Sequence, residues 1–93
     1  MIMRIDFSKN AYGQLKDWRK SNKAVADKIY ELIDDIKTNG LLSGKGKPEK
    51  LRHYKNPVRF SREINRVDRL VYSYNHDDNI LLILSCKGHY EDR

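Results

Sequence analysis

The spacing of hydrophobic residues changes once along this chain, at the loop LLSGKGKPEK, and this change limits the possible folds. Before the loop, apolar residues recur at the three- and four-residue spacing of helices. After it they alternate with polar residues, as in strands. The loop holds two glycines and a proline within five residues, which disfavours regular structure there. Helices first and strands later predict an α+β fold with two segregated layers.

Before the loop, the pattern predicts one short strand and two helices. The strand covers IMRIDF, and Ser8 can cap the helix that follows it. Ser21 and Asn22 end the first helix and begin the second, whose apolar stripe stops at Gly40. Because the connection between them is so short, the two helices are expected to run antiparallel.

After the loop, four strands are expected, the last two joined by the turn sequence HDDN. The element order β-α-α-β-β-β-β therefore places two antiparallel helices on one face of a mostly antiparallel sheet and leaves the other face open. The strand segments are EKLRHY, VRFSREI, RLVYSYN and ILLILSCK. In the second of them Val58, Phe60, Arg62 and Ile64 alternate with Arg59, Ser61 and Glu63.

Size and charge indicate one small domain that binds a polyanion. With 93 residues the chain has room for a single core, so residues 1–93 are expected to form one domain. The net charge is +6, and the segment 41–72 accounts for all of it, with 9 Lys and Arg against 3 Asp and Glu. A localised basic patch is typical of nucleic-acid binding, and the alternative is a basic surface that only aids solubility.

Several classes of protein are excluded by what the sequence lacks. Cys86 is the only cysteine, so neither an internal disulfide nor a CxxC-type zinc site can form, and a buried, inert thiol is expected. We expect no metal and no cofactor. The N-terminal sequence does not have the pattern of a signal peptide, and no apolar stretch approaches the roughly 20 residues of a membrane helix. A cytoplasmic protein that does not enter membranes is expected.

The polar residues of the loop, the strands and the chain end include a carboxylate, guanidinium groups and an imidazole. These groups can accept a proton, clamp a phosphate and donate a proton, which is the chemistry of metal-free RNA cleavage. Without further information each is better explained by a surface ion pair or by cover for the sheet edge than by catalysis. The candidates are Lys45, Lys47, Glu49, Arg52, Arg59, Arg62, Arg69, His89 and Tyr90.

The segments GKGKPEKLR, FSREI, DRLVY and CKGHY, together with the helical stripe IYELIDDIK, occur in the order and spacing of a known family. The chain resembles the YoeB/Txe group of RelE-superfamily toxins over nearly its whole length. The resemblance implies a RelE-like, microbial-ribonuclease-like fold. It also implies a ribosome-dependent endoribonuclease of a type II toxin–antitoxin pair, which cleaves mRNA in the ribosomal A site and inhibits translation.

Carried over by position, the resemblance makes Glu49 the general base, Arg69 the transition-state clamp and His89 the general acid. Tyr90 would stack on a base or orient the substrate. An alternative stays open, with His89 as the base and Glu49 orienting the nucleophile, because cations near a carboxylate generally make it a poorer base. The implied partners are mRNA on the ribosome, an acidic antitoxin that folds as it binds, and a second copy of the chain. The implied RNA contacts are Lys45, Lys47, Arg52, Arg59 and Arg62.

Three positions depart from the family pattern, which commonly has Arg at Glu63, Glu at Val67 and His at Asp68. We therefore expect weaker phosphate contact unless Arg59 or Arg66 compensates. Strand register raises a second question, because an even-numbered HDDN loop would turn the two catalytic side chains on the last strands to opposite faces. An odd loop or a bulge at the glycine before the terminal His-Tyr is predicted.

Two other functions fit the same fold. One is a ParE-like toxin that inhibits DNA gyrase without cutting RNA, and the other is a non-catalytic RNA-binding module. The ParE-like group typically lacks the Glu, Arg and His set, whereas the basic segment alone would suit an RNA-binding module. RNA cleavage that depends on His89 separates the ribonuclease from both alternatives.

Overall fold

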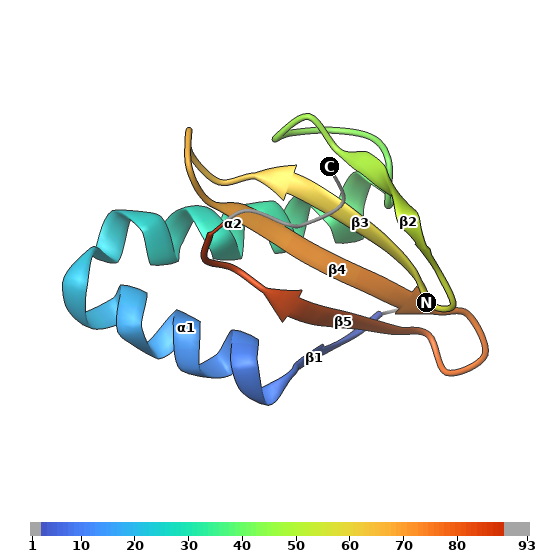
Figure 1. Ribbon diagram of the computed structural model, residues 1–93, viewed down its shortest axis with the longest axis horizontal. Coiled ribbons are helices and arrows are strands. Elements are labelled where there is room, and N and C mark those ends of the chain that lie inside the picture. Colours follow the sequence, from blue (N-terminus) through green and yellow to red (C-terminus); the bar gives the residue numbers. More distant parts are fainter. Residues whose placement is uncertain (1–2, 89–93) are drawn as a thin grey trace.

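Five strands form one mixed sheet in this computed structural model, which describes residues 3–88 (Figure 1). Their spatial order is β1-β5-β4-β3-β2. All neighbouring strands are antiparallel except β1 and β5, which pair in parallel. The predicted element order and the mostly antiparallel sheet are confirmed. The strands are β1 (Arg4–Phe7), β2 (Glu49–Lys55), β3 (Val58–Glu63), β4 (Arg69–Asn75) and β5 (Ile80–Ser85).

The two helices, α1 (Lys9–Ser21) and α2 (Lys23–Asn39), begin and end at the predicted signals. Ser8 Oγ accepts a hydrogen bond from a backbone N–H in the first turn of α1, and Asn22 caps α2 in the same way. Gly40, with φ of 101°, ends α2. No helix in the part of the chain that the structure describes is long and apolar enough to cross a membrane.

The core lies between the helices and one face of the sheet. Cys86 is fully buried in it, as predicted, and this burial raises the pKa of the thiol to about 11. Both amphipathic helices thus cover the same face, and α2 passes behind the sheet in Figure 1. The main contributions come from Ala11, Leu15, Ile29, Leu32 and Ile36 of the helices and from Phe60, Leu70, Tyr72, Leu81 and Ile83 of the strands.

A one-residue bulge sets which β5 residues face β4. The connection 76–79 is even-numbered, and the register then slips by one, because Tyr72 pairs with Ile83 whereas Val71 pairs with Ser85. Leu84 is the extra residue. The predicted odd loop is wrong, because the connection has four residues, and a bulge lies at Leu84. Gly88, where the other alternative placed a bulge, lies beyond the end of β5. The bulge nevertheless shifts the face of every later β5 residue by one position.

Candidate active site

The sheet face that points away from the helices carries two neighbouring rows of cross-strand partners. Glu49, Ser61, Val71 and Ser85 form one row across β2, β3, β4 and β5. In the next row Glu63 of β3 pairs with Arg69 of β4. Because paired residues share a face, Glu49 and Arg69 both lie on this face, which we call the open face because the two helices pack on the other one. Ser61 and Val71 on the open face are nevertheless buried, with 1% and 5% exposure. Ideal sheet spacing puts their Cα atoms about 12 Å apart, so both side chains can reach one phosphodiester group between them.

Arg69 is held in place by the turn that precedes it. Its Nη1 donates to the backbone carbonyl oxygens of Asn65 and Asp68, at 3.3 and 3.4 Å. Its Nη2 lies 3.7 Å from a carboxylate oxygen of Glu63, and 17% of the side chain is exposed. One edge of the guanidinium is therefore anchored to the protein, and the other edge faces an exchangeable counter-ion on the open face.

Glu63 lies between two cations. Its two oxygens are 3.9 Å from Lys47 Nζ and 3.7 Å from Arg69 Nη2. These distances are ion pairs longer than hydrogen bonds. The carboxylate occupies the space between the two positive groups, where a phosphate could also be held. The sequence shows Glu63 as a departure from the family pattern, and the structure gives it a place in the charged cluster.

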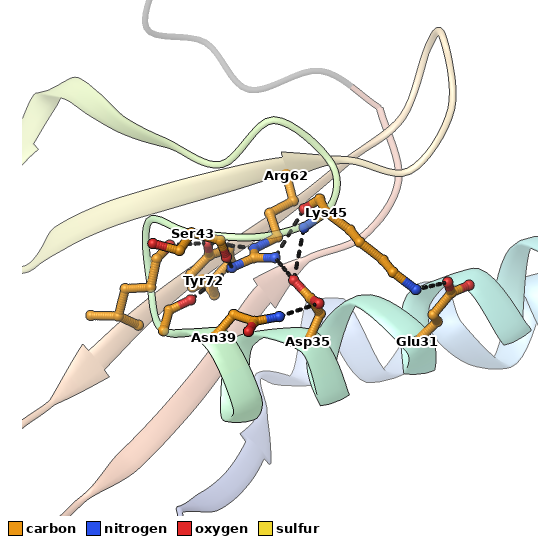
Figure 2. A network of polar contacts seen from close by, with 9 residues as sticks. Glu31, Asp35, Asn39, Ser43, Lys45, Arg62 and Tyr72 are labelled. Atoms are coloured by element: carbon orange, nitrogen blue, oxygen red, sulfur yellow. Dashed lines mark hydrogen bonds and ion pairs between the residues drawn. The ribbon is translucent and has the colours of Figure 1, made fainter.

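The expectation that Arg62 holds an RNA phosphate is wrong for the folded chain, because its side chain is 0% exposed. Its guanidinium forms an ion pair with Asp35 of α2, at 2.5 Å, and donates to backbone carbonyls of the loop that precedes β2 (Figure 2). The strand pattern contained the signal, since Arg62 alternates in phase with Phe60 and Ile64, on the side that packs against the helices. Asp35 was not identified from the sequence.

The other basic residues expected to contact RNA have separate surroundings. Lys45 turns toward α2, where Nζ lies 2.8 Å from a carboxylate oxygen of Glu31, and this hydrogen bond raises the pKa of Lys45 (Figure 2). Arg59 stacks over the ring of Tyr54, with 4.4 Å between the guanidinium carbon and the ring centroid. Arg52 is exposed on β2. Lys47 shares the counter-ion of Arg69, whereas Lys45 and Arg59 are engaged elsewhere.

The chain beyond β5 is tied to the start of β4. Gly88 N donates to Asp68 Oδ1, at 2.7 Å, and Arg69 N donates to the carbonyl oxygen of Gly88, at 3.0 Å. Asp68, another departure from the family pattern, thus anchors Gly88 beside Arg69. The next residues, His89 and Tyr90, lie outside the described residues.

A cleft of about 600 Å³ lies on the open face at the opposite end of β4. Its lining includes Asp6, Ser73, Asn75 and Leu82 and none of the charged cluster around Arg69. A strand of RNA is bound along a charged groove or surface, so its cleavage does not require a closed pocket. We therefore place the candidate active site at Glu49, Glu63 and Arg69 and not in the cleft. Between residues 3 and 88, no group of three His, Cys, Asp or Glu side chains is placed to bind a metal.

Comparison with known proteins gives one consistent family. The model of the YoeB-like toxins of bacterial type II toxin–antitoxin systems matches residues 7–90. Toxin YoeB of Escherichia coli K12 is 36% identical over 88 residues, which is 95% of this chain and the whole of that protein.

Solved structures agree with this result. The YoeB dimer from Staphylococcus aureus has a TM-score of 0.86 and 42% identity over 97% of this chain and all of that chain. The YoeB chain in the heterotetrameric YoeB–YefM toxin–antitoxin complex of the same organism has a TM-score of 0.82 and 41% identity, with the same coverage. The archaeal RelE–RelB complex from Pyrococcus horikoshii has a TM-score of 0.75, and the match covers 98% of this chain and 99% of that chain. Its 21% identity means that it shows the fold alone. The predicted RelE-like fold is confirmed.

Proposed function

Because the chain belongs to the YoeB-like toxins of bacterial type II toxin–antitoxin systems, we propose that it is an endoribonuclease that cleaves mRNA in the ribosomal A site and so stops translation. The observation that carries the proposal is the open face, where Arg69 and Glu49 lie in adjacent rows of the sheet. Gly88, which directly precedes His89 in the chain, accepts a backbone hydrogen bond from Arg69. Such a toxin acts in the cytoplasm, where its ribosomal substrate is.

The proposed reaction uses protein side chains alone. Glu49 removes the proton from a ribose 2′-hydroxyl, and the oxygen attacks the adjacent phosphorus. The bond from phosphorus to the 5′-oxygen breaks, leaving a 2′,3′-cyclic phosphate, and His89 gives a proton to the departing oxygen. Arg69 stabilises the charge that builds on the phosphoryl oxygens. In the alternative assignment His89 is the base and Glu49 orients the nucleophile, and in both assignments Tyr90 would orient the substrate.

The proposed partners follow from the same surface. The S. aureus YoeB forms a complex with YefM and also a dimer. We extend both to this chain as an acidic antitoxin and a homodimer. An antitoxin carboxylate beside Lys47 and Arg69 would take the place of the RNA phosphate. The antitoxin would then inhibit the toxin because both negative groups bind the same two cations. The net charge of +6 favours association with either polyanion.

Ribosomes programmed with a defined codon in the decoding site test the proposal. RNA ends are mapped by primer extension after adding wild type, Glu49→Gln, His89→Gln or Asp27→Asn. The last is a control that removes a carboxylate charge on the surface of α2. Wild type and the control should cut at the decoding site, and the two active-site variants should be slower by at least about tenfold. Absence of a cut by wild type would refute the proposal, and inhibition of DNA gyrase by the same protein would then support the ParE-like alternative.

A further inference from the structure

Arg62 uses all five of its N–H groups inside the protein (Figure 2). Nε donates to Tyr72 Oη at 3.0 Å, and Nη1 donates to Asp35 Oδ2 at 2.5 Å. The three remaining bonds go to the backbone carbonyl oxygens of Gly40, Ser43 and Lys45, at 2.7, 2.7 and 2.9 Å. One side chain thus holds three carbonyls of a loop that has no regular structure.

The partners of Arg62 hold the same loop. Tyr72 Oη donates to the carbonyl oxygen of Leu41, at 2.6 Å, and Asp35 Oδ2 accepts from Lys45 N, at 2.8 Å. Glu63 N donates to the carbonyl oxygen of Gly46, at 2.7 Å. The loop 40–46 is therefore held by these hydrogen bonds at five of its seven residues. It is followed directly by Lys47 and, two residues later, by Glu49, the first residue of β2.

Stability alone does not explain this arrangement. Taking a guanidinium and a carboxylate out of water has a large desolvation penalty, and well-packed apolar residues often replace such buried pairs without loss of stability. Apolar residues could not, however, hold loop carbonyls at defined positions. The planar five-donor fork of arginine can do so, whereas the single ammonium of lysine cannot.

We propose that Arg62 is a positioning residue, which holds the loop 40–46 in one conformation and thereby places Lys47 and Glu49 relative to Arg69. This inference rests on the proposed function and adds a residue that does not touch RNA. A loop that is fixed before the substrate arrives needs no ordering during catalysis, so its backbone entropy does not add to the barrier.

A double-mutant cycle in the ribosome cleavage assay tests the inference. Arg62→Lys should lower the cleavage rate by at least about tenfold, because displacement of a reacting group by about 1 Å can cost up to about 100-fold. In the Glu49→Gln background the same substitution should lower the rate by less than about threefold, because the group that it displaces has already been removed. Ile29→Val, a core truncation in α2, serves as the control, and its effect should be equal in both backgrounds.

Amide hydrogen exchange adds a readout that does not depend on cleavage. In Arg62→Lys, the Lys45 and Glu63 amides should exchange at least about tenfold faster, while amides in the middle of α1 stay unchanged. Should Arg62→Lys fail to fold, Tyr72→Phe removes the hydroxyl that bonds both Arg62 and the loop and should show a smaller effect with the same non-additivity. The inference alone is overturned if wild type cleaves but Arg62→Lys lowers the cleavage rate equally in the wild-type and Glu49→Gln backgrounds, or in neither. Absence of cleavage by wild type refutes the proposed function and the inference with it.

Discussion

In the proposed site, Glu63 would compete with RNA for two cations. Its carboxylate lies between Lys47 and Arg69, which are the positive groups best placed to hold a phosphate on the open face. A phosphate that binds there must displace the carboxylate or bind beside it, against its charge. Under the proposed function, the departure from the family pattern at this position would therefore weaken the binding of RNA without removing the clamp itself.

Glu63→Gln should bind RNA more tightly than wild type, because two cations lose their internal counter-ion. With a short single-stranded 2′-O-methyl RNA, which cannot be cleaved, the dissociation constant at low salt should fall at least about threefold. The salt dependence should steepen by about 0.7 in the log–log slope for each cation released to a phosphate. Fluorescence anisotropy across a salt series measures both. Asp27→Asn, which removes the same charge from α2, should change neither, and equal gains for the two variants would show a general charge effect.

The loop before β2 tolerates little change at Gly46. This residue has φ of +82°, and an added Cβ would lie 3.0 Å from the carbonyl oxygen of Glu63 and 3.1 Å from Cβ of Arg62. Both the backbone conformation and the space there favour glycine. Gly13, in α1, is the opposite case, since an added Cβ would meet nothing within 4 Å.

Replacing each glycine by alanine should therefore change stability in opposite directions. Gly46→Ala should lower the free energy of unfolding by about 1 to 3 kcal/mol, through backbone strain and the close contact with β3. Gly13→Ala should raise it by up to about 1 kcal/mol, because alanine is the better helix former. Equilibrium denaturation in urea measures both. A neutral Gly46→Ala would contradict the tight packing of the loop against β3.

Over the whole molecule, the features predicted from sequence are those set by neighbouring residues. Ser8, Asn22 and Gly40 mark helix ends because a cap bonds the backbone of its own turn. The bulge at Leu84 and the network around Arg62 join distant segments, so no local pattern specifies them. The alternation of β3 did indicate the side on which Arg62 lies, but not that a carboxylate of α2 would meet it there.

The same network makes the stability of the fold depend on pH. The hydrogen bond from Lys45 N, with a further contribution from Arg62, holds the pKa of Asp35 below its usual value, against the opposing effect of burial. Because the folded pKa is depressed, the stabilisation is complete above the unfolded pKa of about 3.9. It is lost as the pH falls through the folded pKa.

Asp35→Asn should therefore be less stable than wild type at pH 6, and its stability should change less between pH 6 and pH 3. Urea denaturation at a series of pH values measures the difference. Asp27→Asn, on the exposed surface of α2, should follow the wild-type curve. Parallel curves for Asp35→Asn and wild type would show that Asp35 has no depressed pKa in the folded protein.

The central claim is that this chain cleaves RNA through the substrate's own 2′-hydroxyl, and a single atom in the substrate tests it most directly. Ribosomes would be programmed with an mRNA that carries 2′-deoxyribose only at the nucleotide 5′ to the mapped cut, beside the all-ribose mRNA. We expect wild-type protein to cut the all-ribose mRNA in the decoding site and to leave the deoxy-substituted mRNA intact. Equal cutting of both, or of neither, would contradict the claim.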